Sequence, residues 1–372
     1  SDAIAGVVNI ILYPDYQGAE LGASASRDAS TGQNERLFNL LAGKGDLERD
    51  GYNVWFSFDA QKRDRLDQTD VSWLKDNDFR NQQGGSLVRN VTNYYNGAPT
   101  QRFPNAAGPL QDIDYGAVNP GKSGRVWAYN PALYTTLMPG IERYHAALRG
   151  SYRLNAGAEA YAEFLYGASH SNQIFGPPLT ISSSLRAWNS ATQSLVPISN
   201  VLPVGNPGNP NATPTPINAT LFDLGQRNKT DSVSFRRLLA GVKGSGDAWD
   251  WDVSGLYSDS RLREYAYNFV NRYAYEALLA NGGYNFADPS QNNDQARNSL
   301  RINTLRPAWY RTASFDATAS TELGQLPAGP LGFAAGYQLR REMMNAGTSP
   351  EVASGAELRP ALDLINGART VQ

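Results

Sequence analysis

Residues 144–169 read YHAALRGSYRLNAGAEAYAEFLYGAS, and this stretch decides the fold class. From 144 to 154 the even positions are apolar or small, whereas the odd positions include Arg149 and Arg153. After a turn at 155–158 the alternation resumes, with Glu159 and Glu163 on the polar side and Leu165 as the exception there. A period of two is typical of β-strands. The stretch therefore predicts a hairpin with one apolar and one mostly polar face.

The same alternation recurs along most of the chain. It is clear in residues 52–61, 249–258, 315–323 and 331–340, and weaker in 19–26, 36–44 and 232–243. Together with the hairpin these segments make roughly nine strands of about ten residues, the length that a tilted strand needs to cross a bilayer.

The connections between these strands alternate in length. Short connections are expected at 45–51, 155–158, 244–248 and 325–329, and long ones at about 66–142, 171–230 and 263–307. Structureless connections of this length are uncommon in a compact soluble domain. A membrane β-barrel explains them, because its turns are tight on the periplasmic side and its loops are large outside. The alternative is a soluble β-sandwich.

Composition excludes several other classes of protein. The 372 residues include 33 Lys and Arg and 35 Asp and Glu, so the net charge of −2 favours no nucleic-acid partner. There is no Cys and there are only 2 His, which removes disulfides and makes a zinc or histidine-based catalytic site improbable. No apolar run reaches 18 residues, which excludes a helical membrane span.

The chemistry of the two faces agrees with a barrel wall. Small and aromatic residues on one face suit lipid, and Arg, Glu, Asp and Ser on the other suit a wet interior. Four aromatic residues at strand ends are typical of interfacial girdles: Tyr52, Tyr144, Trp249 and Tyr257.

The opening residues do not alternate, and here the sequence resembles a known family. The string SDAIAGVVNI at 1–10 is similar to the end of the plug domain of TonB-dependent outer-membrane receptors, just before the barrel begins. GNPGNP at 205–210, WDWDVSGLYSDSR at 249–261 and LPAGPLGFAAGYQLRRE at 326–342 also resemble that family, in the same order. A porin has no use for a buried strand before its first wall strand.

The resemblance implies a division of the chain and a cellular location. Residues 1–14 are expected to be the last segment of the plug, and residues 15–372 the N-terminal part of an incomplete barrel in the cell outer membrane. The family's energy-coupling segment, most of its plug and its closing strands are missing, so we interpret the chain as a fragment. The expected partners are the TonB complex, outer-membrane lipid and a small-molecule nutrient; iron-siderophores, cobalamin and oligosaccharides remain open as ligands.

Candidate functional residues fall into two groups. Aromatic rings in the long loops suit sugars or metal chelates through stacking and directed hydrogen bonds, and we select Tyr94, Tyr95, Trp127, Tyr129 and Trp188. Charged residues on the polar face are expected to line the lumen, and these are Arg149, Glu163, Asp252, Asp316 and Arg340.

Catalysis has little support in the sequence. Paired carboxylates such as Asp250 and Asp252 have a generic spacing, and no nucleophile elbow surrounds any Ser. We expect no catalytic residue, no metal site and no cofactor.

We therefore expect an all-β protein: a partial antiparallel transmembrane β-barrel with short periplasmic turns and long extracellular loops. The expected function is active uptake of a scarce nutrient with energy from the TonB complex. The alternatives are a passive porin-like channel and a soluble glycan-binding β-protein.

Overall fold

A computed structural model describes residues 15–92, 110–209, 211–246, 248–286, 289–347, 349–358 and 365–371. The expected plug segment, 1–14, lies outside the described residues, as do Tyr94 and Tyr95. No helix among the described residues combines the length and the hydropathy that a membrane span requires.

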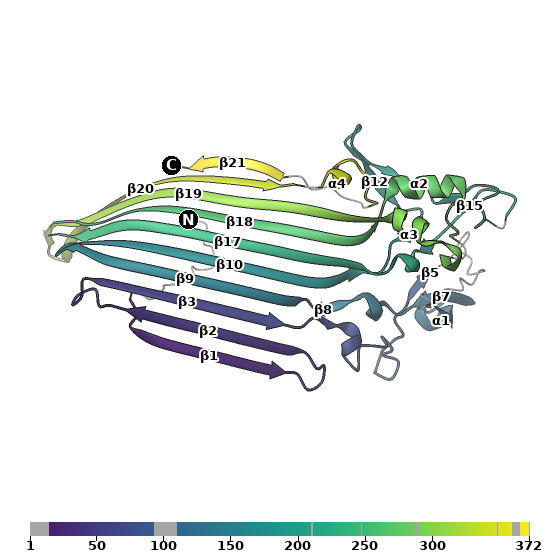
Figure 1. The fold of residues 1–372 in the computed structure, drawn as a ribbon, viewed down its shortest axis with the longest axis horizontal. Helices are drawn as coiled ribbons and strands as arrows, with labels where there is room; N and C mark the ends of the chain where they lie inside the picture. Colours follow the sequence, from purple (N-terminus) through teal and green to yellow (C-terminus); the bar gives the residue numbers. More distant parts are fainter. Residues whose placement is uncertain are drawn as a thin grey trace.

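One antiparallel sheet of ten strands dominates the structure, and its strand order follows the chain (Figure 1). Its strands are β1 (Gly18–Arg27), β2 (Asn34–Lys44), β3 (Tyr52–Arg63), β9 (Gly140–Asn155), β10 (Ala158–Gly176), β17 (Arg227–Ser245), β18 (Asp250–Val270), β19 (Arg301–Leu326), β20 (Gly329–Ala346) and β21 (Ile365–Val371). All nine expected strands are present, and β21 is an addition. The predicted all-β antiparallel fold is confirmed.

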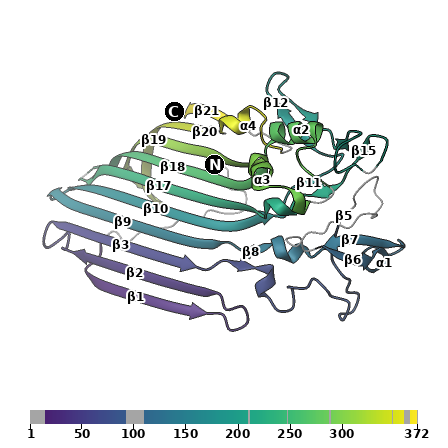
Figure 2. The same cartoon turned by 45° about the vertical axis from the view of Figure 1, so that its right-hand side comes forward.

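The connections gather by length at the two ends of the sheet. Short links join β2 to β3, β9 to β10, β17 to β18 and β19 to β20 at one end, the short-turn end. The connections from β3 to β9, β10 to β17, β18 to β19 and β20 to β21 are long, and their described residues lie at the other end, the loop end (Figures 1 and 2). The six-residue link between β1 and β2 is the one short link at the loop end of the described sheet.

The strands are longer than the expected ten or so residues. β10 and β17 have 19 residues each, β18 has 21 and β19 has 26. Their extra length lies at the loop end, so the long connections are shorter than the sequence suggested. At the loop end apolar and polar residues no longer alternate along the strands, so the sequence pattern did not predict these residues as strand.

The chain enters the sheet at the short-turn end. The Asn53 side chain holds residue 16 in both directions: the Tyr16 amide donates to Asn53 Oδ1 at 3.3 Å, and Asn53 Nδ2 donates to the Tyr16 carbonyl at 3.0 Å. The lead-in lies so close to β2 that a Cβ on Gly43 would come within 2.3 Å of the Tyr16 carbonyl oxygen. Asn53 is on the polar face, so the lead-in segment lies on that side of the sheet.

The described parts of the long connections contain short strands and helices. The first contains β4 (Leu66–Asp67), β5 (Asn90–Thr92), β6 (Gln111–Asp114), α1 (Tyr115–Val118), β7 (Arg125–Tyr129) and β8 (Thr136–Met138). The others contain β11 (Thr180–Ile181), β12 (Arg186–Asn189), β13 (Ser194–Pro197), β14 (Val201–Leu202), β15 (Thr215–Pro216), β16 (Ala219–Thr220), α2 (Arg272–Asn281), α3 (Asp294–Leu300) and α4 (Pro350–Ala353). Most of these strands pair locally in two-stranded ribbons, and β5, β7 and β6 form a three-stranded sheet.

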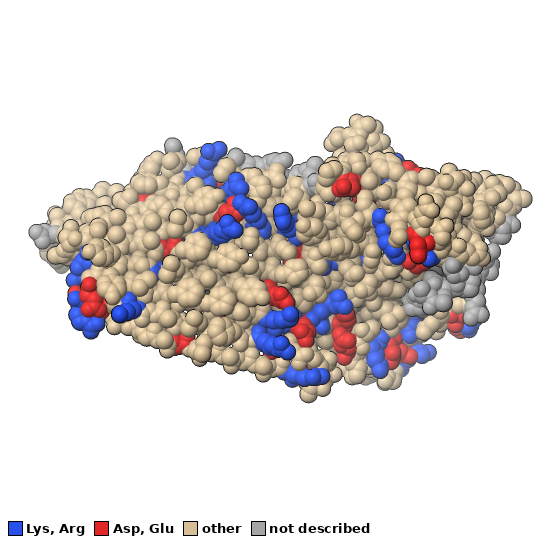
Figure 3. Space-filling view, in the orientation of Figure 1, with Lys and Arg blue, Asp and Glu red and all other residues tan. Residues whose placement is uncertain are grey.

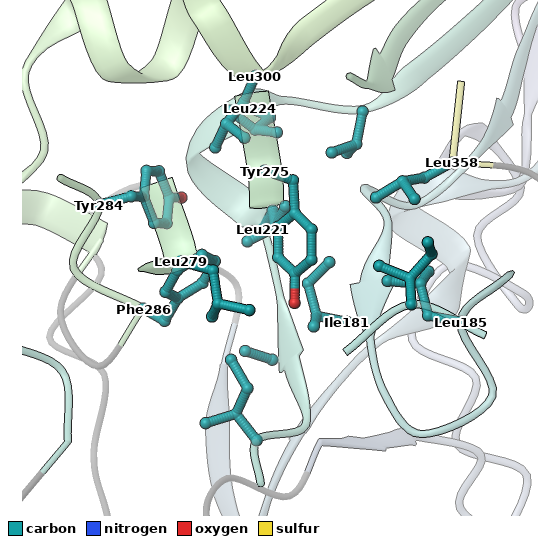
Figure 4. Close-up of a cluster of buried hydrophobic side chains, with 14 of the residues drawn as sticks. Ile181, Leu185, Leu221, Leu224, Tyr275, Leu279, Tyr284, Phe286, Leu300 and Leu358 are labelled. Carbon is teal, nitrogen blue, oxygen red and sulfur yellow. The ribbon is translucent and has the colours of Figure 1, made fainter. Parts of the chain in front are cut away.

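The largest hydrophobic core of the described residues is in these connections, not on the sheet. The described residues of 177–226, 271–300 and 349–358, which we call the loop cap, pack around Tyr275, Tyr284 and Leu300, each fully buried (Figure 4). The Tyr275 hydroxyl donates to the Ser199 carbonyl at 2.8 Å, so this buried polar group is satisfied. The cap is therefore a folded unit at the loop end.

Candidate functional site: the two faces of the sheet and the loop cap

A charge network occupies the polar face where β9, β10 and β17 meet. Glu163 is only 7% exposed and accepts from two guanidinium groups, Arg149 and Arg237, the latter at 3.0 Å. Arg149 also lies over the Tyr161 ring, 5.8 Å from its centroid. Because a buried carboxylate needs partners of opposite charge, the two arginines hold Glu163 in place.

The other predicted lumen residues lie on the same face, further along the sheet. Asp252 accepts from the Tyr161 hydroxyl at 2.8 Å. Asp316 accepts from the Ser314 hydroxyl at 2.9 Å, and Arg340 lies 3.4 Å from the Glu342 carboxylate. All five predicted residues thus share one face, although only Arg149 and Glu163 contact each other. Whether that face lines a lumen stays a prediction.

A second charge network lies on the polar face towards the loop end. Lys229 Nζ is 2.7 Å from Glu264 and 3.4 Å from Asp231. Arg306 bridges Glu264, at 4.0 Å, to Glu357 of the loop cap, at 3.8 Å. This network ties the last connection to the upper part of the sheet. Sequence reading missed it, because 301–307 was assigned to a loop.

The opposite face of the sheet is apolar and exposed. Leu148, Phe164, Leu238 and Phe315 are 40–51% exposed, and among the described residues no second layer covers them. The alternative of a β-sandwich requires such side chains to be sealed between two sheets, and no such core is formed on this face by the described residues. Monomeric soluble proteins rarely expose apolar areas of this extent.

This apolar band has a sharp limit towards the loop end. On each strand from β2 to β20, the first Arg, Lys, His, Asp or Glu on this face marks the limit, counted from the short-turn end and beyond Lys44, which lies at that end of β2. These side chains are Arg36, Lys62, Glu142, His170, Arg236, Asp259, Arg311 and Arg341. From Tyr52 to Lys62, or from Tyr152 to Glu142, the band is about ten residues long. That is about 33 Å along a strand and about 27 Å along the normal of a sheet tilted by about 35°.

The loop-end limit runs obliquely to the hydrogen-bonded rows. The row that starts at Lys62 on β3 passes, strand by strand, to Pro307 on β19. The Pro307 carbonyl accepts a hydrogen bond from the Gly347 amide, which extends the row to the end of β20. The limit on β20 is Arg341, about six residues short of Gly347. Six residues are about 20 Å and six strand spacings are about 29 Å, which corresponds to a tilt of about 35°.

The limit at the short-turn end shifts by the same amount. The row from Tyr52 ends at Tyr337 on β20, and the band there reaches about six residues further, to Leu331, which is 45% exposed. The band therefore keeps a constant height while the strands cross it at about 35°, the lower end of the tilt range of transmembrane barrels.

Aromatic residues mark both limits of the band. Tyr52 and Trp249 lie at its short-turn end, and Tyr144 and Tyr257 each lie two residues before the charged limit. All four are 37–46% exposed. This is the distribution that interfacial aromatic belts have.

The predicted loop aromatics have different surroundings. Tyr129 on β7 is 4% exposed, its ring centroid is 5.2 Å from that of Phe222, and its hydroxyl accepts from Asn90 Nδ2 at 3.0 Å. So enclosed a ring joins two connections instead of offering a face to a ligand. Trp127 packs partly against the loop-cap core, and Trp188 on β12 is half-buried. The structure does not bring these aromatics together as one cluster.

Burial perturbs two titratable groups inside the loop cap. The Tyr284 hydroxyl donates to Asp223 Oδ1 at 2.6 Å, within the core shown in Figure 4. Burial raises the pKa of Asp223 above its usual value, although the hydrogen bond from Tyr284 opposes the rise. Burial and the neighbouring carboxylate raise the pKa of Tyr284 well above 10.0. The hydrogen bond from Tyr284 to Asp223 thus lies inside the packed cap, and the charge of the Asp223 carboxyl depends on pH.

A metal site is not formed by the described residues, since no three His, Cys, Asp or Glu side chains gather there in a way that could hold an ion.

The faces and connections define a class of structure: an antiparallel β wall with an exposed apolar band, a polar opposite face and a folded cap at one end. No family model matches the sequence, and no curated protein matches it. Among solved structures the chain is similar to the open form of the ferric-catecholate import receptor Fiu from E. coli K12, with a TM-score of 0.37 and 11% identity. The match covers 95% of this chain and 45% of the receptor, so the chain spans less than half of that protein's length.

Proposed function

We propose that this chain forms part of the wall of a TonB-dependent receptor in the bacterial outer membrane. The observation that carries the proposal is the apolar band, about 27 Å high, with aromatic residues at both limits and a strand tilt of about 35°. A soluble protein has no reason to keep the height of an exposed apolar band constant across tilted strands.

The polar face is then the lumen side of the wall. Charges occur on it at many levels, from Glu159 near the short turns to Glu264 near the loops, as a hydrated interior allows. The lead-in at Tyr16 lies on this side at the short-turn end. A plug that precedes it in the chain would enter the lumen from the periplasm, which agrees with the resemblance of SDAIAGVVNI to the end of a plug.

The loop cap is then the extracellular part that meets a scarce nutrient. Its buried core fixes the loops, and a fixed loop surface binds with less ordering cost than a flexible one. Trp127 and Trp188 remain candidate contact residues at its edge. The ligand classes open from the sequence are iron-siderophores, cobalamin and oligosaccharides, and we assign no catalytic step to the chain.

Uptake by the full-length gene product tests both the receptor and its energy source. The gene is expressed in an outer-membrane receptor-deficient strain, and uptake of radiolabelled ferric siderophores, cobalamin and maltooligosaccharides is measured with and without a working TonB complex. Uptake of one ligand that stops without the complex supports the proposal. Uptake that continues without the complex identifies a passive channel, and recovery of the protein in the soluble fraction rejects the membrane assignment.

A further inference from the structure

Four arginines lie at or just beyond the loop-end limit of the apolar band. Arg36, Arg236 and Arg341 mark the limit on their strands, and Arg263 lies four residues beyond Asp259 on β18. Arg36, Arg236, Arg263 and Arg341 are exposed on the apolar face of β2, β17, β18 and β20. None of them makes an ion pair or a side-chain hydrogen bond with any other residue that the structure describes. On the lipid side of a barrel these guanidinium groups would point towards the membrane rather than into the bore.

The carboxylates at the same level are already neutralised. Glu142 pairs with Lys62 at 2.5 Å. Asp259 pairs with both Arg261, at 2.7 Å, and Arg311, at 2.8 Å. Cations therefore outnumber carboxylates along this limit, although the whole chain has a net charge of −2. We call the charged residues at this limit, together with Arg261 and Arg263 just beyond it on β18, the basic belt.

The basic belt is localised to one level of one face. In Figure 3 charged side chains form an oblique row across the middle of the molecule, and the surface from that row towards the short turns is mostly uncharged. On β3, β9 and β18, the described part of the apolar face between the short turns and the basic belt carries no Lys, Arg, Asp or Glu. A solvated surface of a soluble protein would distribute cations and anions over the whole face.

A shallow hollow at the centre of the belt adds hydrogen-bond donors to this charge. It is lined on the apolar face by Glu142, Tyr144, His170, Ser232, Ser234, Arg261 and Arg263. The Glu142 carboxylate in this lining is paired with Lys62. Guanidinium and hydroxyl groups together suit phosphate, because a guanidinium donates two parallel hydrogen bonds to it and hydroxyls complete its shell. The apolar band immediately below suits the acyl chains of the same molecule.

We propose that the basic belt binds the phosphate groups of lipid headgroups in the outer leaflet. This inference rests on the proposed membrane orientation, because only that orientation places the belt at the headgroup level on the loop side. The occupant is a phosphorylated lipid rather than free phosphate, since the charges and the acyl-compatible band are continuous on one surface. The belt would then fix the height of the barrel in the membrane and fill its boundary with anionic lipid.

Native mass spectrometry of the full-length gene product in detergent tests the belt, with diphosphoryl lipid A as the probe. The variant Arg236→Gln/Arg263→Gln/Arg341→Gln removes three belt charges. The control Arg49→Gln/Arg80→Gln/Arg125→Gln removes three charges outside the belt, from side chains that are 71%, 57% and 62% exposed. Each basic group near an anionic membrane surface contributes about fivefold to binding, so the belt variant should lose about 100-fold in affinity and the control almost none.

Two readouts keep the proposal falsifiable if the belt variant does not fold. The wild-type protein should bind diphosphoryl lipid A at least tenfold more tightly than lipid A from which both phosphates have been removed. Equal binding of the two lipids, or equal losses in the belt and control variants, overturns the belt. Outer-membrane insertion is scored separately by heat-modifiable mobility, so that failure of the proposed receptor is distinguished from failure of the belt.

Discussion

Phe164 and Leu165 are consecutive residues of β10 that lie on opposite faces of the sheet. Substituting each by Arg compares the loss of stability on the apolar face with the loss on the polar face. Phe164 lies near the middle of the apolar band and is 40% exposed. An Arg at the midplane of a barrel's lipid face costs about 2–4 kcal/mol. Phe164→Arg should therefore lower the ratio of folded to unfolded protein by about 30- to 700-fold.

Leu165→Arg makes the same kind of change on the polar face. Its cross-strand neighbour on β17 is Arg237, and repulsion between like charges across a sheet costs less than about 1 kcal/mol. Both variants are made in the full-length gene and measured by equilibrium urea unfolding in phospholipid vesicles. Equal losses of unfolding free energy, or a larger loss for Leu165→Arg, would refute the assignment of lipid side and lumen side.

Three further predictions concern the polar face and the loop cap. Glu163→Gln removes the negative charge that Arg149 and Arg237 share and replaces one of the two acceptor oxygens by an NH2 group, and should cost about 1–3 kcal/mol in the same urea assay; no change would show that the ion pairs add nothing to stability. Tyr275→Ala empties the centre of the cap and should cost about 3–5 kcal/mol there, so hydrogen exchange should rise in α2 and α3 but not in β9 and β10; a uniform rise would contradict a separately packed cap. Because burial raises the pKa of Asp223, its contribution to folding is present at low pH and is lost as the pH rises through the folded-state pKa. Protection of α2, corrected for intrinsic exchange, should therefore fall with rising pH in the wild type and less in Asp223→Asn; parallel curves would remove Asp223 as the cause.

The strands and their faces were predictable because the alternation of side chains is local. Residues 144–169 are sufficient to define the β9–β10 hairpin, and its register places Leu148 against Phe164, and Arg149 against Glu163, as two faces require. The turn is tighter than expected, with only residues 156–157 outside the two strands.

Strand ends were not predictable, because the physical contrast between the faces ends at the basic belt. Above that level both faces of β19 are partly polar, so residues 301–307 show no period of two and were assigned to a loop. β21, INGARTV at 365–371, likewise has polar and small residues on both sides of the alternation. Its strand depends on pairing with β20, which a local pattern does not contain.

The loop cap was hidden for a different reason. Its core combines Ile181, Leu221, Tyr275 and Tyr284 from two connections, and no periodic spacing links residues so far apart in the sequence. Tyr129 illustrates the consequence: an aromatic ring in a long loop suggests ligand contact, whereas here it packs against Phe222 of another connection. The GNPGNP motif also has a packing role, since Asn206 Nδ2 donates to the Leu279 carbonyl at 3.0 Å and fastens the end of α2.

The central claim is that the apolar face of this sheet meets lipid, and site-directed spin labelling tests it most directly. The sequence contains no Cys, so a single Cys substitution at each of positions 142–152 gives a protein with one spin label. In vesicles that contain the full-length protein, we predict that labels at even positions from 144 to 152 collide mainly with oxygen. Labels at odd positions should collide mainly with a water-soluble nickel chelate, and the label at 142 should mark the change to water. Preferential nickel access at the even positions, or no alternation at all, would contradict the account.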